Sequence, residues 1–166
     1  MDFKESLDNK VVLLTGINGG IGKEIARQLL DENAKVIGMT SHVKNKKKVH
    51  LNLSNHKNLI EVFSCNLESS GNVDRVCNKI IDKYGYPDFI VNNAASLDLK
   101  NLEDFKLDEI NSAFKINILA PMQICKNFIQ GFKNRKSGSI VNICSSSAYN
   151  GGGTSGHTVY ASTKHA

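Results

Sequence analysis

A tyrosine and a lysine near the end of the sequence have the spacing and the chemistry of a proton-transfer pair. Tyr160 and Lys164 are four residues apart, so a helix would place them on one face, one turn apart. A free tyrosine has a pKa of about 10, which is too high for easy proton exchange at neutral pH. A neighbouring ammonium group favours the phenolate and lowers that pKa. The spacing also occurs by chance in many helices, so its weight depends on what precedes it.

A run of serines precedes this pair and follows an apolar segment, residues 139–143, that we expect to be a strand. A hydroxyl at the carboxyl end of a parallel strand faces the ligand crevice, where Ser145 could donate to a carbonyl oxygen. Ser146 and Ser147 are interpreted as a polar turn. A serine hydrolase is not supported, because no Gly-x-Ser-x-Gly elbow surrounds these serines and no His–Asp pair is evident.

A glycine-rich turn near the start of the sequence could bind a phosphate. Gly16, Gly20 and Gly22 lie between an apolar segment at residues 10–15 and an amphipathic one at 21–33. A turn that leaves a strand and opens a helix offers free N–H groups and the positive end of the helix dipole. This context favours a phosphate-containing ligand, although the Gly-x-x-x-Gly-x-Gly spacing differs from the usual dinucleotide fingerprint.

Apolar segments and amphipathic segments alternate along the rest of the sequence. Strands are expected at 10–15, 34–39, within 59–66, at 89–91 and at 139–143, and helices at 21–33, 73–84 and 108–132. Residues 42–57 give no clear pattern, and residues 150–156 are flexible by composition. The alternation predicts an α/β doubly wound parallel sheet of the Rossmann type, in one domain.

Three asparagines stand at positions where either a structural or a functional role is possible. Asn117 is flanked by apolar residues in the expected helix 108–132, so it is either a buried, satisfied amide or a functional one. Asn92 and Asn93 follow a strand, where they could tie neighbouring strand ends together or line a ligand crevice. The residue pattern leaves these alternatives open.

Composition excludes several classes of protein. The 166 residues are 40% hydrophobic and 22% charged, which is typical of a globular domain, with no membrane-span or signal-peptide pattern; a cytoplasmic location is the default expectation. The four cysteines lack metal-ligand spacing, so we expect reduced thiols and no metal. Much of the net charge of +5 lies in Lys44, Lys46, Lys47 and Lys48, which we interpret as a solvated face, not a nucleic-acid site. A third interpretation of these lysines is that they lie near a phosphate of a bound cofactor.

At these motifs the sequence resembles the short-chain dehydrogenase/reductase family, in its single-domain main subgroup. The matching segments are residues 15–22, 92–95, 117, 140–145 and 160–164, in the family's order. The resemblance implies a catalytic tetrad of Asn117, Ser145, Tyr160 and Lys164. Tyr160 would protonate the carbonyl oxygen as hydride arrives, Lys164 would lower its pKa and hold the nicotinamide ribose, Ser145 would orient the carbonyl, and Asn117 would anchor a proton-relay water.

The resemblance also implies a set of cofactor-binding residues. They are Gly16, Asn18, Gly20, Ile21, Gly22, Thr40, Ser41, Asn66, Leu67, Asn93, Ala94, Tyr160 and Lys164. NAD-preferring members place an aspartate at the end of the second strand, where this sequence has Thr40 followed by Ser41 and His42. The absence of an acidic residue and the nearby lysines favour NADP. NAD remains the alternative, because the arginine expected of an NADP enzyme is absent.

Family members continue well past the Tyr-x-x-x-Lys helix, so we expect residues 1–166 to be one domain that is incomplete at its C-terminus, with C-terminal strands missing. The implied function is hydride transfer between NAD(P)(H) and a small-molecule carbonyl or secondary alcohol, in a protein that forms homo-oligomers when complete and binds neither nucleic acid nor membrane. The alternative is an inactive truncated fragment that keeps only nucleotide binding or an interaction. An epimerase is less favoured, because its glycine spacing differs. The strand at 140–143 is expected to be an exposed edge.

Overall fold

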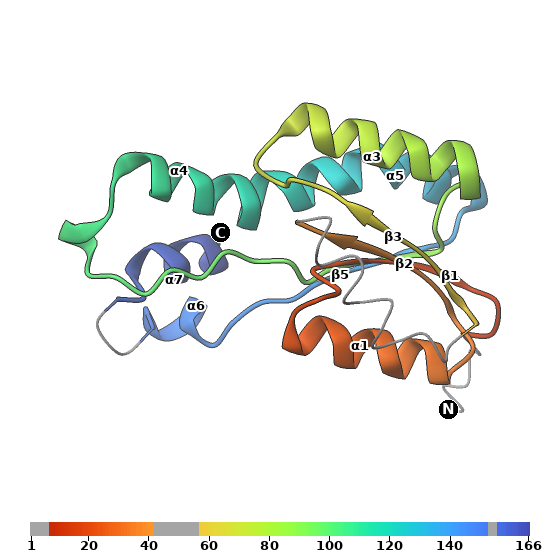
Figure 1. The fold of residues 1–166 in the computed structure, drawn as a ribbon, viewed down its shortest axis with the longest axis horizontal. Coiled ribbons are helices and arrows are strands. Elements are labelled where there is room, and N and C mark those ends of the chain that lie inside the picture. Colours follow the sequence, from red (N-terminus) through yellow and green to blue (C-terminus); the bar gives the residue numbers. More distant parts are fainter. Residues whose placement is uncertain (1–6, 42–56, 153–155) are drawn as a thin grey trace.

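The computed structural model describes residues 7–41, 57–152 and 156–166, and it contains one parallel sheet (Figure 1). The strands are β1 (Val11–Thr15), β2 (Lys35–Thr40), β3 (Leu59–Ser64), β4 (Phe89–Asn92) and β5 (Ser139–Asn142). Their order is β3-β2-β1-β4-β5, and every neighbouring pair is parallel. This confirms the predicted α/β doubly wound fold. The four clustered lysines and the loop residues 153–155 lie outside the described residues.

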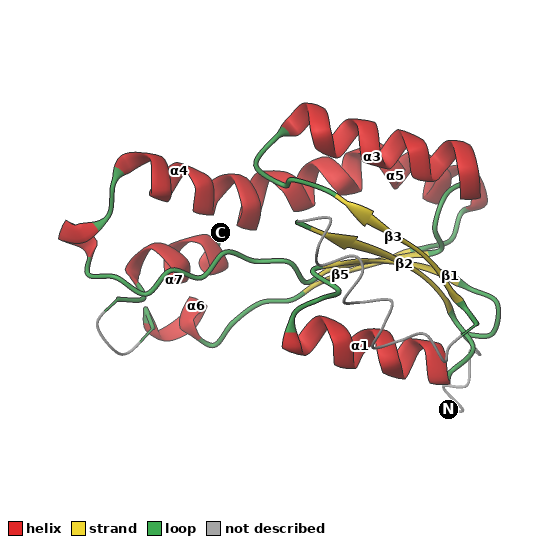
Figure 2. Ribbon diagram, viewed as in Figure 1, coloured by secondary structure: helices red, strands yellow, loops and turns green. Residues whose placement is uncertain are grey.

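The helices lie on both faces of this sheet and beyond one end of it (Figure 2). They are α1 (Gly20–Asp31), α3 (Ser70–Tyr84), α4 (Leu107–Phe114), α5 (Ala120–Arg135), α6 (Ser147–Asn150) and α7 (Thr158–His165), with a short 3-10 turn at Leu102–Asp104. The second predicted helix begins at Ser70 instead of residue 73, because the Ser69 side chain caps it by accepting from the Asn72 N–H. The 3-10 turn and α6 were not predicted.

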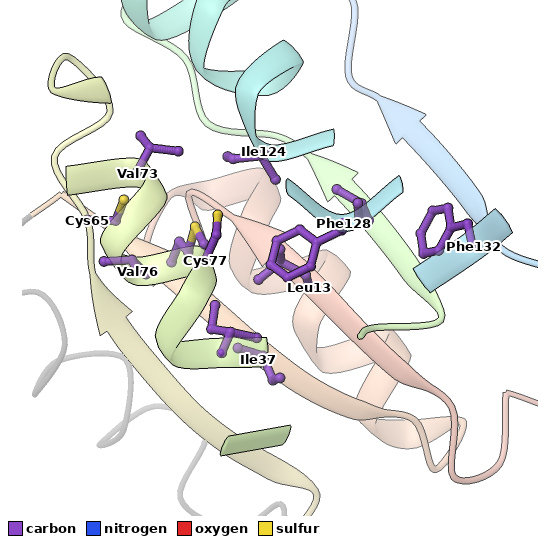
Figure 3. Packing of buried hydrophobic residues seen from close by; sticks show 12 residues of the cluster. Leu13, Ile37, Cys65, Val73, Val76, Cys77, Ile124, Phe128 and Phe132 are labelled. Atoms are coloured by element: carbon purple, nitrogen blue, oxygen red, sulfur yellow. The ribbon is translucent and has the colours of Figure 1, made fainter. Parts of the chain in front are cut away.

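The alternation of side chains along the central strand builds the two layers of the core. Leu13 packs with residues of α3 and α5, including Phe128, on one face of the sheet (Figure 3). Val12 and Leu14 point to the opposite face, where α1 covers them with Ala26. Because successive residues of a strand face opposite sides, a strand that is apolar throughout can be buried by both layers.

The long helix predicted at 108–132 differs from the prediction in its middle. Between α4 and α5 the backbone forms a π-helical segment, Lys115–Leu119, which contains Asn117. A π turn inserts one extra residue into the helix, and such segments are common at functional sites. Apolar spacing gives little sign of a single extra residue, so the sequence predicted an uninterrupted helix.

The chain reverses its direction of travel across the sheet at β1. The first three strands run outward in the order β1, β2, β3, and the chain then returns to place β4 on the other side of β1. In open α/β sheets, ligands bind outside the carboxyl ends of the strands at such a switch point.

At the far end of the sheet, β5 is the edge of the described strands, and Val141 is 48% exposed, as expected for this segment.

Candidate functional site

An open cavity of about 790 Å³ lies at the switch point, over the carboxyl ends of the central strands. Eleven of the thirteen residues predicted to bind the cofactor line it: Gly16, Asn18, Gly20, Ile21, Gly22, Thr40, Ser41, Asn66, Leu67, Asn93 and Ala94. They come from four separate segments, so the fold brings together what the sequence holds apart. Further lining residues that sequence reasoning missed include Cys65, Glu68, Ser96, Leu97 and Ile116, which carry no motif of their own.

The glycine turn has the shape that a phosphate-binding site requires. Gly16 has a φ of +67°, and a Cβ there would lie 2.9 Å from the Cα of Ala94. A Cβ on Gly22 would lie only 2.1 Å from the carbonyl oxygen of Gly16, whereas one on Gly20 would meet nothing within 4 Å. The backbone of the turn therefore leaves no room for a side chain at Gly22, whereas the space beside Gly20 is free and adjoins the cavity.

The start of α1 offers unpaired N–H donors to this cavity. Its N-cap is Gly19, which has no side chain to cap the helix, and its first turn carries no acidic residue. The first N–H groups of an α-helix have no partner within the helix, and the helix dipole makes this end attractive to anions. The turn can therefore hold a pyrophosphate by its backbone alone.

Asn93 fixes the floor of the cavity by tying the ends of β1 and β4 together. Its amide nitrogen Nδ2 donates to the carbonyl oxygens of Thr15 at 3.0 Å and Gly16 at 3.3 Å. The backbone N–H groups of Asn93 and Ala94 both donate to Thr15 Oγ1 at 3.0 Å. Both roles considered for Asn93 therefore hold, since it ties strand ends and lines the cavity. Asn92 faces β5 instead, where its Nδ2 donates to Asn142 Oδ1 at 2.9 Å.

Thr40, at the end of β2, is hydrogen-bonded to Asn18, and both residues line the cavity. Thr40 is almost fully buried, and its hydroxyl donates to the side-chain oxygen of Asn18 at 2.8 Å. Ser41, the next residue, is exposed. At the end of β3, the side-chain oxygen of Asn66 accepts from the Glu68 N–H at 3.0 Å, which holds that loop in a turn.

Tyr160 and Lys164 both lie on α7, where their spacing places them one helical turn apart. The Lys164 Nζ is 5.9 Å from the centre of the Tyr160 ring and donates to the carbonyl oxygen of Ile143 at 2.8 Å. Burial lowers the pKa of Lys164, because removing the ammonium group from water disfavours its charged form. The Cys144 thiol donates to the Lys164 carbonyl oxygen at 3.3 Å, so the end of β5 holds this helix by two contacts.

Asn117 is a buried amide whose side-chain oxygen and nitrogen both form hydrogen bonds. Its Oδ1 accepts from the Ser96 N–H at 2.8 Å, and its Nδ2 donates to the Ser96 carbonyl oxygen at 3.0 Å and to Thr163 Oγ1 at 2.8 Å. Ser96 lines the 790 Å³ cavity, and Thr163 is on α7. The π-helical segment therefore connects the cavity wall to the helix that carries Tyr160.

A second cavity, of about 580 Å³, adjoins this connection. Asn117, Lys164 and Cys144 line it, and Ala94 lines both cavities. Tyr160 and Lys164 do not line the first cavity, so their part in cofactor binding stays a prediction. Among the described residues, the side chains of Ser145, Tyr160 and Lys164 make no hydrogen bonds to one another; Ser145 Oγ accepts from the Ser147 N–H at 3.2 Å. Their catalytic roles also stay predictions.

Two features of the described residues bear on metal binding and on membrane insertion. Over residues 7–41, 57–152 and 156–166, no group of three or more His, Cys, Asp or Glu side chains could hold a metal ion. Within those same ranges, no helix is both long and apolar enough to cross a membrane.

Comparison with protein families gives one match over nearly all of the sequence. The model of the family described as short chain dehydrogenase matches residues 10–166. Among curated proteins, an uncharacterized oxidoreductase of Thermotoga maritima is 28% identical over 141 residues, which cover 84% of this chain and 55% of that protein. An NADPH-dependent pterin aldehyde reductase of Arabidopsis thaliana is 26% identical over 82% of this chain and 56% of its own length. The chain thus spans little more than half of these relatives.

Solved structures agree with this match. A metagenomic short-chain oxidoreductase in complex with NADP superposes with a TM-score of 0.87 at 26% identity, over 96% of this chain and 70% of its own. A short-chain dehydrogenase of Streptomyces avermitilis superposes with a TM-score of 0.81 at 25% identity, over 99% of this chain and 57% of its own.

Proposed function

Because this chain belongs to the short-chain dehydrogenase family, we propose that it supplies the nucleotide site and the proton-transfer residues of an NADP(H)-dependent oxidoreductase acting on a carbonyl or secondary alcohol. The observation that carries the proposal is the gathering of eleven predicted nucleotide residues around one cavity at the start of α1. The NADPH-dependent plant relative and the neighbour solved with NADP support the choice of cofactor.

The residues around the cavity fit a dinucleotide. The uncapped start of α1 and the open position of Gly20 suit a pyrophosphate, and Thr40 puts no carboxylate beside a 2′-phosphate. Asn66 and Leu67 line the cavity beyond β2, where the adenine would lie, and Asn93 and Ala94 line it on the side of β4. When bound, the nicotinamide would supply or accept the hydride.

Residues of this chain would donate or accept the proton that is transferred along with the hydride. Reduction of a carbonyl needs one proton on oxygen, and Tyr160 is the proposed donor. Lys164, on the same helix, places its Nζ 5.9 Å from the centre of the Tyr160 ring. Ser145 would donate to the carbonyl oxygen and orient it. In the oxidation direction these steps would run in reverse, with a deprotonated Tyr160 oxygen taking the proton from the alcohol that Ser145 orients.

Two variants separate this proposal from the alternative of an inactive, nucleotide-binding fragment. NADPH binding is measured by fluorescence titration, and turnover by NADPH oxidation with 4-nitrobenzaldehyde as an aldehyde probe. Tyr160→Phe should lower turnover by about 10²–10⁴-fold and leave NADPH affinity nearly unchanged. Lys164→Met should lower both turnover and NADPH affinity. Near-normal turnover by Tyr160→Phe would contradict the proposed proton donor, and NADPH binding by the wild type without any turnover would favour the alternative.

We further propose that the protein self-associates through exposed apolar side chains of α4, the π-helical segment and α5. Apolar side chains stay exposed along this helix, and Leu107 and Met122 are 72% and 65% exposed. The others on this face are Phe114, Leu119 and Ile129. Contiguous exposed apolar side chains are typical of a protein interface, and this helix carries several large ones.

A further inference from the structure

We propose that Cys144 is a thiol-modification site, and that the second cavity, of about 580 Å³, admits to it an anionic peptide disulfide such as oxidised glutathione. Cys144 follows β5 and lines this cavity, whose other lining residues come mainly from β4, β5, α5 and α7. The site is independent of the proposed oxidoreductase function, because thiol modification requires neither NADPH nor turnover.

The four thiols of the chain differ in their access to solvent. Cys144 is exposed. Cys65 and Cys77 are buried, and Cys125, which also lines the second cavity, is half-buried. Burial raises the pKa of Cys65 to about 11 and that of Cys77 to about 12, and it also raises the pKa of Cys125. Because the thiolate is the form that attacks a disulfide, reaction at neutral pH is expected at Cys144.

A buried oxygen in the wall of the same cavity lacks a hydrogen-bond partner. Asn92 lines the cavity and is only 5% exposed, and its Nδ2 donates to Asn142 Oδ1 at 2.9 Å. The Asn92 Oδ1 accepts no hydrogen bond from any described residue. A buried acceptor without a partner is unfavourable, so a ligand that brings an N–H group to it is stabilised. The amide groups of a peptide are donors of this kind.

The charge of the cavity favours an anionic ligand. Lys164 lines it from α7, and no aspartate or glutamate is among the described residues that line it. Burial lowers the pKa of Lys164, and its electrostatic interaction with Cys144 opposes this effect, so the ammonium group lies within electrostatic reach of the sulfur. A glutathione carboxylate that enters the cavity would therefore be attracted to Lys164.

The modification is a thiol–disulfide exchange. The Cys144 thiolate attacks one sulfur of oxidised glutathione, whose S–S bond breaks as a new S–S bond joins Cys144 to one glutathione. The second glutathione leaves as a thiolate and takes up the proton that Cys144 lost, so Cys144 is oxidised as this glutathione is reduced. The unmodified thiol donates to the Lys164 carbonyl oxygen at 3.3 Å, and the modified sulfur has no proton to donate. Modification should therefore loosen the last turn of α7.

Mass spectrometry tests the site after the reduced protein is incubated with oxidised glutathione. Cys144 should carry nearly all of the adduct, and Cys144→Ser, which keeps a hydroxyl donor for Lys164, should carry almost none. Hydrogen exchange in α7 should be faster in the adduct than in the unmodified protein, and dithiothreitol should reverse this. An adduct that is spread evenly over the four cysteines, or absent from Cys144, would overturn the proposal. Unchanged exchange in α7 would refute the effect on that helix.

Three disulfides separate recognition by the cavity from the reactivity of any exposed thiol. They are oxidised glutathione, the amide-free anion 3,3′-dithiodipropionate and the cation cystamine, and each rate at Cys144 is divided by the rate at Cys144 in the urea-unfolded chain. This ratio should be highest for oxidised glutathione and about 2–10-fold lower for cystamine, the effect of one nearby charge. A dithiodipropionate ratio equal to that of oxidised glutathione would refute the role of Asn92. Equal ratios for all three would overturn the proposal.

Lys164→Gln should remove the difference between oxidised glutathione and cystamine, because it removes the ammonium group from the cavity. Lys133→Gln is the matched control, since it removes the charge of an exposed lysine near the end of α5, and it should keep the difference. Thermal melts of both variants show that they are folded. A difference that persists in Lys164→Gln would refute the attraction of the ligand to this ammonium group.

Discussion

The amide of Asn117 donates a 2.8 Å hydrogen bond to the hydroxyl of Thr163, and both side chains are buried. The Thr163 hydroxyl in turn donates to the carbonyl oxygen of Tyr160, also at 2.8 Å. Thr163 thus connects the π-helical segment to the turn of α7 that carries the proposed proton donor. Because α7 has only eight residues, which is too short for an isolated helix to be stable in water, contacts of this kind decide whether it forms.

Replacing Thr163 with valine should destabilise the protein. The substitution keeps the branched shape but removes an acceptor from a buried amide, which costs about 1–3 kcal/mol. Urea unfolding measures the loss, and hydrogen exchange should show faster exchange in α7 than in β1. Thr163→Ser is the control, because it keeps the hydroxyl and should restore most of the protection. Equal exchange rates in α7 for the wild type and Thr163→Val would show that this bond does not hold the helix.

Two alanine substitutions in the glycine turn should have opposite consequences. Gly22→Ala should destabilise the fold, because its Cβ would lie 2.1 Å from the Gly16 carbonyl oxygen. Gly20→Ala should leave the free energy of unfolding unchanged or slightly higher, because its Cβ meets nothing within 4 Å, yet it should weaken NADPH binding by narrowing the approach to the backbone. Urea unfolding and NADPH titration of both variants check this. Two variants that behave alike in both measurements would contradict the assigned roles.

The buried thiols of Cys65 and Cys77 should make the protein less stable at alkaline pH. Burial raises their pKa from the ordinary 9.0 to about 11 for Cys65 and about 12 for Cys77. Above pH 9 the unfolded chain loses these protons before the folded chain does, so the free energy of unfolding falls as the pH rises from 9 toward 11 and 12. Urea unfolding across pH 8–11 measures this slope.

Cys77→Ala should flatten this slope, even though it lowers stability overall by opening a small cavity. Val62→Ala, which also removes buried methyl groups, is the packing control and should keep the wild-type slope. An unchanged slope in Cys77→Ala would show that its thiol does not contribute.

Adding a charge at the exposed Ile129 should weaken self-association. If the exposed apolar side chains of α5 form the interface, Ile129→Glu should bury a charge there and shift the protein toward monomer. Sedimentation velocity over a range of concentrations measures this shift. Gln130→Glu, which changes an exposed residue on the same helix, is the control for added charge. A wild type that is monomeric throughout the range would refute the proposed interface.

The sequence by itself determined the layers of the fold and the identity of most cavity residues. The alternation of apolar strands with amphipathic helices predicted all five strands, and the glycine spacing between residues 15 and 22 located the turn that we propose binds a phosphate. These features are local, because strand and helix periodicity and backbone freedom at glycine depend on neighbouring residues. Periodicity therefore placed α1 and α3 within a few residues of their observed bounds.

Tertiary structure alone decided the orientation of polar groups and the partners they meet. Nothing in the sequence shows that Thr40 is buried and that its hydroxyl donates to Asn18. Nor does the sequence show that Asn117 lies in a π turn and donates to Thr163. These pairs are separated by 22 and 46 residues, and they form only when strands and helices pack. A buried polar group must find a partner wherever packing places one, so its partner depends on the whole fold and not on the residues beside it.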